Sequence, residues 1–310
     1  MSKLDAVTGA FSYSGAAIAR ELLKRGHQVR TLTGHPDRAP AGTPIECRPL
    51  DFGDPDGLRA SLTGVHTLYN TYWIRFAHGT VNHEVAVANN RVLFAAAAAA
   101  GVQRIVHISI TNPSHDSPDS YFRGKAAAEQ ALAESGVPGY AVARPAILFG
   151  SAGVLVNNVA WLLRRLPVFA IGGRGDYRLR PIHVDDLGVL CADLGSRTDT
   201  VVLDAVGPES LTFRQFVESI RAAVASRSLV IPVPGVLIPV LAGALNVALR
   251  DTLLTAGEYR SLAAGRADSA GPATGTTAFT EWVQAHGSEL GRRYLNELDL
   301  HFRATRLAAG

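Results

Sequence analysis

Apolar residues in the first half of the chain follow two alternating patterns. Short continuous apolar runs predict buried strands over residues 3–8, 28–32, 45–49, 67–70, 104–109 and 140–143. Between these runs, apolar residues recur every three or four positions, which predicts helices over residues 16–25, 54–62, 81–100 and 121–134. Strands that alternate with helices imply parallel β-α-β units. The pattern therefore predicts an α/β fold built on a doubly wound parallel sheet.

From Gly150 onward the alternation is less regular. Strand-like runs occupy residues 181–184, 201–205 and 229–233, and helical patterns occupy residues 156–165, 213–225, 236–249, 280–286 and 290–302. The polar stretch 260–277 is rich in Ala and Gly, so we expect an exposed loop there. We expect two domains. Residues 1–149 contain the sheet, residues 150–310 form a small mixed α/β lobe, and strands around 181–205 return to the sheet.

Residues 228–249 carry no charged side chain, although Arg227 and Arg250 lie on either side. A membrane-spanning helix needs about 20 apolar residues. Three prolines interrupt the first half of this segment, and proline disrupts helix interiors. We therefore expect a short strand followed by a helix that is buried in a core or in a dimer interface, with no membrane association. A helix that contacts lipid is the alternative.

Composition excludes several classes of protein. Hydrophobic residues make up 47% of the 310 positions and charged residues 18%, which provides a sizeable core and excludes global disorder. A net charge of +3 is too small for a dedicated nucleic-acid binder. Two cysteines, Cys47 and Cys191, fit neither a disulfide framework nor a Cys-based zinc site, and the ten histidines show no metal-ligand spacing. We expect no metal, a cytoplasmic location, and a monomer or homodimer.

The first predicted strand runs into the turn Thr8-Gly9-Ala10-Phe11-Ser12-Tyr13-Ser14-Gly15, and a helix follows. Glycines at such a turn let backbone N–H groups approach a pyrophosphate at the helix N-terminus. The usual spacing would place a glycine where Ser12 stands, and its hydroxyl could itself contact a phosphate. The candidate cofactor-binding residues of the turn are Gly9, Phe11, Ser12, Tyr13 and Gly15. A glycine-rich turn without a ligand is the alternative.

Residues at the end of the second strand indicate which dinucleotide binds. NAD binders commonly carry a carboxylate there, which holds the ribose hydroxyls. In this chain no carboxylate follows the strand directly, whereas Arg30, His35 and Arg38 lie close by. We therefore expect NADP, with NAD as the alternative, and His35 and Arg38 as candidate contacts for the 2′-phosphate. The other interpretation is that these residues are ordinary loop charges.

Tyr121 and Lys125 are four residues apart in the helix predicted after the fifth strand, so they share one face. The chain has only three lysines, which makes such a pair infrequent by chance. A free phenol has a pKa near ~10, and a nearby ammonium group favours the phenolate. Tyr121 could then exchange a proton with a substrate hydroxyl or carbonyl, with Thr111 or Ser109 as a hydroxyl donor opposite. An incidental surface pair is the alternative.

These motifs give the chain a family resemblance. It resembles the extended and atypical short-chain dehydrogenase/reductases, the NAD(P)-dependent epimerase/dehydratase group. Within that group it is similar to the branch related to NmrA-like proteins and to the nucleotide-binding accessory subunit of respiratory complex I. The matching positions are Thr8-Gly9 to Gly15, Asp51-Phe52, Asn89, Ala100-Gly101-Val102, Tyr121 with Lys125, Arg144-Pro145 and residues 181–187. The resemblance implies a Rossmann-type sheet with a small mixed α/β C-terminal substrate lobe.

The resemblance also implies roles for individual residues. Asp51 and Phe52 would contact the adenine, and Lys125 would hold the nicotinamide ribose. Thr111 maps onto the catalytic hydroxyl, although Ser109-Ile110-Thr111 departs from the family's Ser-Ser-Ser or Ser-Ser-Thr triplet. The remaining cofactor contacts would be Asn70, Thr71 and Tyr72 beside the ribose and pyrophosphate, and Pro145 to Leu148, including Ile147, beside the nicotinamide.

Substrate residues are harder to predict, because the C-terminal lobe has few motifs. Trp73 and Phe76 follow the fourth strand, at the carboxyl edge where open α/β sheets bind ligands. The candidates for substrate contact are Trp73, Phe76, Asn112, Trp161 and His183, and plain core packing is the alternative for the aromatic ones. Asp185 and Asp186 look like paired carboxylates, but the family uses this segment to tie the second lobe to the sheet.

Three hypotheses about function remain. The first is an NADP-dependent oxidoreductase that acts on a carbonyl or secondary alcohol of a small organic molecule, or an epimerase or dehydratase with the same machinery. The second is a cofactor-binding regulator or assembly subunit, as NmrA-like and complex I relatives are. Such relatives typically lack the Tyr/Lys pair, so Tyr121 and Lys125 favour an enzyme. The third is non-redox chemistry, such as a cyclisation, on the same fold.

Overall fold

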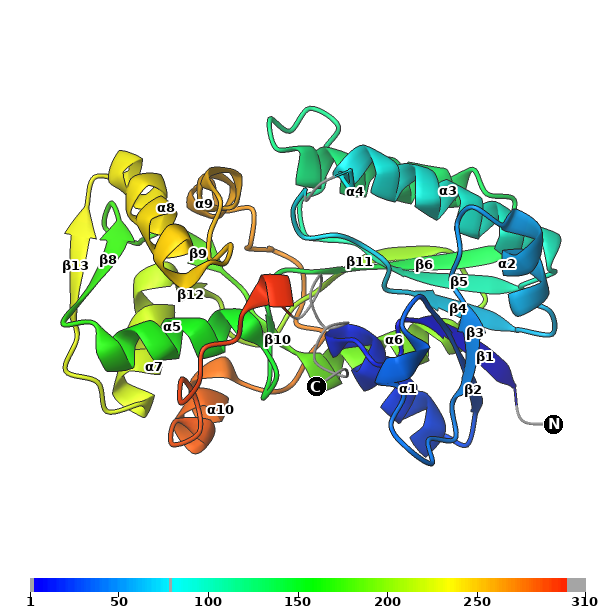
Figure 1. The fold of residues 1–310 in the computed structure, drawn as a ribbon, viewed down its shortest axis with the longest axis horizontal. Coiled ribbons are helices and arrows are strands. Elements are labelled where there is room, and N and C mark those ends of the chain that lie inside the picture. Colours follow the sequence, from blue (N-terminus) through cyan, green and yellow to red (C-terminus); the bar gives the residue numbers. More distant parts are fainter. Residues whose placement is uncertain (1–2, 78–79, 300–310) are drawn as a thin grey trace. The chain divides into compact units, whose positions relative to one another are not determined.

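The computed structural model describes residues 3–77 and 80–299, which form two compact units (Figure 1). The first unit combines the residues up to Pro145 with Val184–Val206 and Gly271–Gly275. The second combines Ala146–His183, Gly207–Ala270 and the residues from Thr276 onward. Both units are therefore discontinuous in sequence.

The first unit contains a seven-stranded sheet in the order β11-β6-β5-β4-β1-β2-β3. All neighbouring strands pair in parallel. The strands are β1 Leu4–Thr8, β2 Gln28–Thr33, β3 Glu46–Pro49, β4 Thr67–Asn70, β5 Arg104–Ile108, β6 Gly139–Pro145 and β11 Val201–Ala205. The strand order reverses between β1 and β4, as in the Rossmann arrangement, where ligands bind at this switch point. The predicted Rossmann-type parallel sheet is confirmed.

Helices cover both faces of this sheet (Figure 1). On one face lie α2 Pro55–Ser61, α3 His83–Ala99 and α4 Ser120–Ala133. On the other face lie α1 Tyr13–Lys24 and α6 Val184–Ser196, and a short 3₁₀ turn, η1 Pro36–Arg38, follows β2. Helix α1 begins three residues before its predicted start, because Ser12 already has the extended backbone of an N-cap residue.

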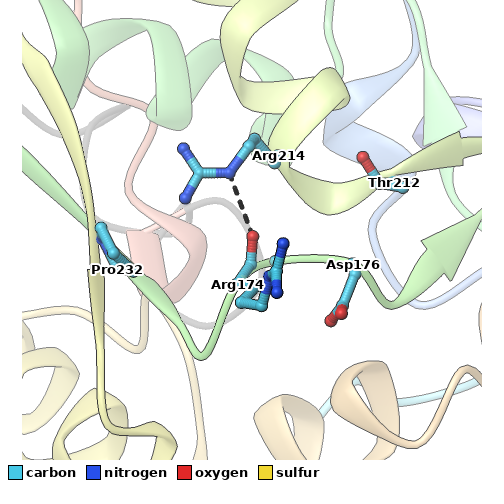
Figure 2. A pocket seen from close by; sticks show the side chains of 6 residues that line it. Arg174, Asp176, Thr212, Arg214 and Pro232 are labelled. Carbon is cyan, nitrogen blue, oxygen red and sulfur yellow. Dashed lines mark hydrogen bonds between the residues drawn. The ribbon is translucent and has the colours of Figure 1, made fainter.

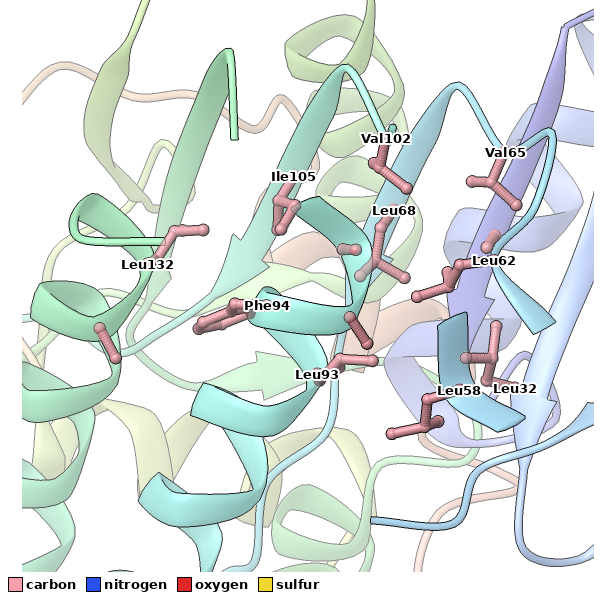
Figure 3. Packing of buried hydrophobic residues seen from close by; sticks show 14 of the residues in the cluster. Leu32, Leu58, Leu62, Val65, Leu68, Leu93, Phe94, Val102, Ile105 and Leu132 are labelled. Carbon is pink, nitrogen blue, oxygen red and sulfur yellow. The ribbon is translucent and has the colours of Figure 1, made fainter. Parts of the chain in front are cut away.

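Large aliphatic and aromatic side chains fill the layer between the sheet and helices α2, α3 and α4 (Figure 3). Leu58 and Phe94 point from the helices toward the sheet, and Leu68 and Ile105 point from the strands toward the helices. Each is fully or almost fully buried. Burying a side chain of this size stabilises the fold by about 1.5–3 kcal/mol. This layer holds β4 and β5 in place, and with them the loops at their carboxyl ends.

Helix α6 was missed in the sequence, where residues 181–184 read as a strand. The strand, β10 Ile182–His183, ends one residue earlier, and the helix begins at Val184. Its apolar spacing was a usable signal, because residues 184, 187, 191 and 194 are all buried. A Cβ on Gly188 would come within 2.8 Å of the Ala17 carbonyl oxygen, so glycine lets α6 approach α1 closely.

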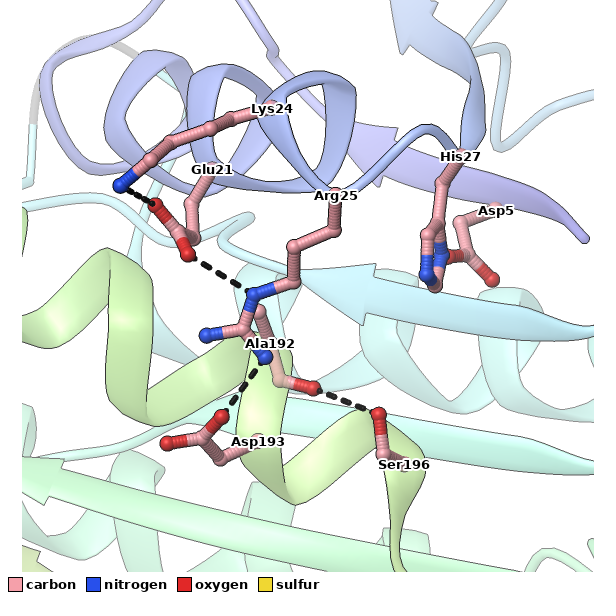
Figure 4. Close-up of polar contacts among 8 residues, drawn as sticks. All are labelled: Asp5, Glu21, Lys24, Arg25, His27, Ala192, Asp193 and Ser196. Carbon is pink, nitrogen blue, oxygen red and sulfur yellow. Dashed lines mark hydrogen bonds and ion pairs between the residues drawn. The ribbon is translucent and has the colours of Figure 1, made fainter.

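Ion pairs reinforce the contact between α1 and α6. The Arg25 guanidinium bridges Glu21 on its own helix and Asp193 on α6, with N–O distances of 2.8 and 2.6 Å (Figure 4). Arg20 pairs in the same way with Asp185. Asp185 therefore joins α6 to α1 within the first unit. Its ion pair with Arg20 does not place it at a catalytic site.

The second unit is built from short sheets and five helices in its described part. The strands are β7 Leu148–Phe149, β8 Val168–Gly172, β9 Arg178–Leu179, β10, β12 Leu211–Thr212 and β13 Leu229–Val233, which pair as β10-β7, β12-β9 and β13-β8. The helices are α5 Val154–Arg165, α7 Phe213–Ala223, α8 Ile238–Leu249, α9 Ala256–Ala263 and α10 Phe279–His286, with a 3₁₀ turn η2 Gly235–Leu237. An aromatic cluster that includes Phe149, Phe216, Phe279 and Trp282 forms its core.

One prediction for the second unit was partly wrong and another was wrong. The expected loop over residues 260–277 forms from residue 264 onward, but residues 260–263 are the last turn of α9. A capping box at Thr255 and Glu258 starts this helix, which buries Tyr259. The expected helix over residues 290–302 is turn, bend and irregular backbone up to residue 296 and helical only over residues 297–299, and residues 300–302 lie outside the described part. Side chains of α5 bind that backbone instead, since Asn158 donates to the Leu295 carbonyl and Arg164 to the Leu290 carbonyl.

The uncharged segment also differs from expectation. The strand β13 and the helix α8 form as predicted, but only Ile238 and Ala242 of α8 are buried. The helix is therefore not a core helix of this chain. Within the described residues, no helix is both long and apolar enough to cross a bilayer.

Candidate active site

The turn after β1 has the backbone geometry of a phosphate-binding loop. Gly9 has a φ of +64°, in the left-handed region that favours glycine. A Cβ on Gly15 would collide with the Gly9 carbonyl oxygen, so only glycine lets α1 pack this closely on the turn. Ser12 has a φ of −86°, which any L-residue adopts, and this explains why a serine can replace the usual glycine. Its side chain makes no capping bond to the helix.

Hydrogen bonds from Thr8 tie the ends of β1 and β4 together. The Thr8 hydroxyl oxygen accepts from the backbone N–H groups of Thr71 and Tyr72 at 2.7 and 3.1 Å. The Thr71 hydroxyl in turn donates to the Thr8 carbonyl at 2.5 Å. Thr71 therefore lies against the phosphate-binding loop, and its contact with the cofactor stays a prediction. Thr8 itself was not predicted as a site residue.

A buried polar network lies next to the loop that follows β4. The Asn70 side-chain amide donates to Asn90 Oδ1 at 2.6 Å and lies 3.0 Å from His107 Nδ1. All three side chains are fully buried, and burial lowers the pKa of His107 well below its ordinary value, so the ring is neutral. Buried hydrogen bonds of this kind hold a loop in one conformation. His107 Nε2 has no hydrogen-bond partner among the described residues. Asn70 thus has a structural role that its sequence position alone did not reveal.

Asp51 and Phe52, the residues predicted to contact adenine, lie in the loop that follows β3. The Phe52 ring lies 4.6 Å from the Tyr72 ring, and the Tyr72 hydroxyl accepts from the Asn89 amide at 2.7 Å. Asp51 is exposed and accepts from the Gly53 backbone N–H at 2.8 Å. The structure therefore brings together Phe52 and Tyr72, which are far apart in sequence, beside the end of β3.

Tyr121 and Lys125 both contact the ring of Trp73. The Tyr121 ring meets Trp73 edge to face with centroids 6.0 Å apart, and Lys125 Nζ lies 4.5 Å from the centroid of Trp73. Lys125 Nζ also donates to the Ile108 carbonyl at 2.8 Å. Gly124 makes this possible, because a Cβ there would come within 3.0 Å of the Trp73 ring. The pair thus faces the carboxyl ends of β4 and β5, where the sequence places the site.

Burial of Lys125 changes its protonation. Its side chain is only 3% exposed. Removal from water lowers the pKa of Lys125 to about 7, and the carboxylate of Glu129 opposes this shift. The ammonium therefore loses its proton near neutral pH, where an ordinary lysine stays charged.

The predicted hydroxyl donors lie at the end of β5. Ser109 and Thr111 are both buried, and Ser109 Oγ has no hydrogen-bond partner among the described residues. A buried hydroxyl without a partner is a candidate for binding a ligand. Asn112 follows in the left-handed region, with a φ of +54°, and its side chain is exposed.

The residues predicted to select the cofactor differ in their positions. His35 is exposed and Arg38 half-buried, both in the loop directly after β2. Arg30 points elsewhere, because its guanidinium pairs with Glu46 at 2.8 Å and donates to the carbonyls of Ser61 and Thr63. Arg30, which the sequence places close to His35 and Arg38, is therefore engaged with other groups.

Three predicted residues belong to the second unit. Trp161 packs against the Tyr294 ring at 5.2 Å and under the Arg165 guanidinium at 4.5 Å. His183 contacts the Phe149 ring at 5.1 Å and the Trp282 ring at 5.7 Å. Ile147 accepts a backbone hydrogen bond from Ile182.

Four other predicted residues lie in the first unit. Phe76, Phe11 and Tyr13 are half-buried there, and Pro145 is buried.

His83 is a site residue that the sequence analysis missed. Its ring stacks on Trp73 at 6.0 Å and meets the Tyr121 ring edge to face at 5.5 Å. His83 Nδ1 lies 2.8 Å from the Ser120 hydroxyl, and burial lowers the pKa of His83. Its position at the start of the long helix after β4 was the available signal. The rings of Trp73, His83 and Phe122 thus contact the Tyr121 ring.

Within the described residues, no group of three or more His, Cys, Asp and Glu side chains could hold a metal ion. The geometry instead fits a dinucleotide. A glycine turn at a helix N-terminus suits a pyrophosphate, and the aromatic pair beside β3 suits a flat ring.

Comparisons with known proteins agree with this geometry. Residues 9–156 match the model of the NAD(P)H-binding family. Over 193 residues the chain is 25% identical to subunit 9 of the NADH dehydrogenase (ubiquinone) 1 alpha subcomplex from Arabidopsis thaliana mitochondria. That match covers 58% of this chain and 47% of the relative, so the chain spans about half the length of this curated relative.

Solved structures with low sequence identity share the fold. Triphenylmethane reductase from Citrobacter sp. superimposes with a TM-score of 0.75 at 17% identity, over 93% of this chain and 100% of that chain. The NADPH-dependent quinone oxidoreductase of Escherichia coli superimposes with a TM-score of 0.73 at 22% identity, over 91% and 99% of the two chains.

Proposed function

From the match of residues 9–156 to the NAD(P)H-binding family, we propose that the chain is an NADP-dependent oxidoreductase of the extended short-chain dehydrogenase/reductase group. Its substrate would be a ketone, quinone or secondary alcohol of a small organic molecule. The observation that carries the proposal is the placement of Tyr121 and Lys125 around Trp73, with Lys125 buried. Such a pair is costly to bury and has no evident structural purpose.

The chain's own residues supply binding and proton transfer. The turn from Gly9 to Gly15 would receive the pyrophosphate, and Phe52 with Tyr72 would bind the adenine. When bound, the nicotinamide supplies or accepts a hydride. Lys125 would hold the nearby ribose.

Tyr121 would act as the general acid in reduction and as the general base in oxidation. Its hydroxyl would give a proton to the substrate oxygen, or take one from it. Lowering a phenol pKa from ~10 toward 7 requires about 4 kcal/mol of preference for the phenolate. The Lys125 ammonium, one helical turn away, favours the phenolate, and Ser109 Oγ would donate a hydrogen bond to the same substrate oxygen.

NADP is favoured over NAD. No carboxylate directly follows β2, and Arg38 stands in the next turn with His35 beside it. Two of the structurally similar reductases were solved with NADP(H) or NADPH, which supports the same choice. Cys47 and Cys191 are both free, which is consistent with the reducing cytoplasm that we propose as the compartment.

A non-catalytic regulator or assembly subunit is the second candidate, because the chain is similar to a respiratory complex I subunit. A non-redox epimerase, dehydratase or cyclase is the third. The three differ in what they require of Tyr121 and of the cofactor, so one substitution separates them.

We expect Tyr121→Phe to lose about 10²–10⁴-fold in turnover, because it removes the general acid and base. Affinity for NADPH should change less than about 2-fold, since the turn and Lys125 stay intact. The measurement is NADPH oxidation with a panel of aromatic and alicyclic ketones and quinones. Tyr140→Phe, on β6, is the control and should keep full activity.

The same assay is run with reduced, oxidised and no cofactor. Full activity of Tyr121→Phe would overturn the catalytic assignment. Inactivity of wild type toward every substrate of the panel, with NADPH still bound, would favour a regulator. Turnover without any cofactor would instead establish non-redox chemistry.

A further inference from the structure

The second unit exposes apolar side chains along most of residues 229–247. In α8 the most exposed are Val240 and Val247, at 67% and 80%, and Val236 in the preceding turn is 80% exposed. On β13, Leu229 is 61% exposed. We call the exposed apolar side chains of residues 229–247 the apolar face: Leu229, Ile231, Val236, Val240, Leu241 and Val247 are its main members.

Helix α8 differs from an ordinary surface helix because its exposed side is apolar as well as its buried side. Such a helix buries an apolar stripe and shows polar side chains to water. Here the exposed positions 240, 241, 244, 247 and 248 are all apolar, whereas the polar Asn246 turns inward and bonds to the backbone of Leu253 and Leu254. The helix is therefore anchored to its unit and presents its apolar side outward.

Strand β13 also exposes apolar side chains. It pairs in parallel with β8, so Leu229 lies opposite Val168, and Val168 is also exposed. Val230 and Phe169 on the other side of this two-stranded sheet pack against the core of the unit. One side of the sheet thus holds the fold together while the other is open. Contiguous apolar surface of this kind marks an interaction site.

Basic side chains border the apolar face. Pro232 of β13 lines a cavity of about 480 Å³ together with Arg174 and Arg214 (Figure 2). Asp176 and Thr212 line it as well, and Arg214 Nε donates to the Arg174 carbonyl at 3.0 Å. The charged residues that directly flank the segment, Arg227 and Arg250, are both exposed.

We propose that this face docks the protein onto the surface of a bilayer that contains anionic phospholipids. The apolar face would enter the boundary between headgroups and acyl chains, as interfacial helices do. The guanidinium groups of Arg174, Arg214, Arg227 and Arg250 would bind lipid phosphates, for which arginine is suited. The proposal does not depend on the proposed activity.

Charge favours a bilayer over a second copy of the chain. In a two-fold dimer the same patch faces itself, so the arginines of one copy would meet those of the other. Residues 227–250 contain no carboxylate, and among the described residues Asp176 is the one acidic side chain that lines the cavity beside Arg174 and Arg214. An anionic lipid surface complements both the apolar and the basic parts of the face.

The test is co-sedimentation of the full chain with vesicles of phosphatidylcholine alone or mixed equally with phosphatidylglycerol. The double variant Val236→Asp/Val240→Asp places charges on the apolar face at exposed positions that the fold does not need buried. Arg174→Gln/Arg227→Gln removes two of the bordering charges. Val189→Asp, on α6 at a position that is 40% exposed, is the matched control in the first unit. NADPH binding by each variant reports an intact fold.

We expect wild type and Val189→Asp to sediment with the anionic vesicles, and less so in high salt, because salt screens the arginines. The double Asp variant should lose at least about 10-fold in apparent partition, and the double Gln variant a smaller factor. Equal sedimentation of the double Asp variant and wild type would overturn the proposal. The absence of vesicle binding by wild type would also overturn it. If wild type is then a dimer that the double Asp variant dissociates, the face belongs to a second copy of the chain.

Discussion

Lys125 is an ionisable side chain at a position that excludes water, and its protonation affects folding. Burial lowers the pKa of Lys125 to about 7, whereas a lysine in an unfolded chain titrates near ~10.4. Between these two values the unfolded chain keeps a proton that the folded protein has lost. The free energy of unfolding therefore rises with pH across this window, and below about pH 7 the folded protein bears the full cost of the buried charge.

We expect Lys125→Met to be more stable than wild type at pH 6, by about 2 kcal/mol, because an apolar side chain of similar size replaces the buried charge. The advantage should shrink toward pH 10, and turnover should be lost at every pH. Urea denaturation midpoints across this range provide the measurement. Lys24→Met, at an exposed lysine on α1, should show no such trend. A stability difference that does not change with pH would contradict the assigned pKa.

Arg38 is the residue on which the choice of cofactor depends most. We expect wild type to bind NADPH more tightly than NADH. Arg38→Ser should weaken NADPH binding by about 10-fold or more and leave NADH unchanged, because a charge-assisted contact to the 2′-phosphate is lost. Fluorescence titration with both nucleotides measures this, with Arg59→Ser on α2 as the control. Equal affinities of wild type for the two nucleotides would refute the preference.

At the scale of elements, the contact between the β1 turn and α1 determines whether the phosphate-binding loop forms. Gly9 supplies the left-handed backbone, and Gly15 lets the helix lie directly on the Gly9 carbonyl. Both requirements are steric, so no other side chain can satisfy them without moving backbone.

We expect Gly15→Ala to lose at least about 10-fold in NADPH affinity and to destabilise the protein by about 1–3 kcal/mol, because its methyl group collides with backbone. Gly34→Ala is the matched control, since a Cβ at Gly34 meets nothing within 4 Å. Calorimetric titration and thermal unfolding measure the two effects. Unchanged affinity in Gly15→Ala would mean that the turn does not bind the cofactor.

At the scale of the whole molecule, the first unit depends on residues that follow a long excursion of the chain. Strand β11 extends the sheet beyond β6, and α6 covers the face that α1 leaves open. Arg104 at the start of β5 donates to the carbonyls of Leu194 and Asp199, at 2.6 and 2.9 Å. A Cβ on Gly195 would collide with the buried Tyr69 hydroxyl, so α6 and β4 are in close contact.

We expect a chain that ends after residue 149 not to fold cooperatively, although it contains the whole segment first predicted as a domain. It would expose the apolar side of α1 and leave Arg104 without its acceptors. Circular dichroism during heating and limited proteolysis, with the full chain as reference, provide the test. A sharp unfolding transition and NADPH binding by residues 1–149 would disprove this dependence.

The sequence by itself determined the features that arise from local patterns. The alternation of strands and helices, the glycine turn after β1, and the spacing of Tyr121 and Lys125 were all readable, because each depends on residues within a few positions of one another. The sheet type followed, because β-α-β units leave parallel pairing as the usual arrangement. Helix α6 was readable in principle from its apolar spacing, but the strand-like residues before it obscured its start.

Only the tertiary structure decided which distant groups meet. Trp73 packs on Lys125, whose burial brings the pKa of the lysine near 7. Glu46 and two backbone carbonyls bind the Arg30 guanidinium away from the cofactor loop. The uncharged residues 228–249 predicted a buried helix, yet α8 lies with its apolar side exposed. Burial and charge pairing arise from neighbours far apart in sequence, and no local pattern of residues records which neighbours these are.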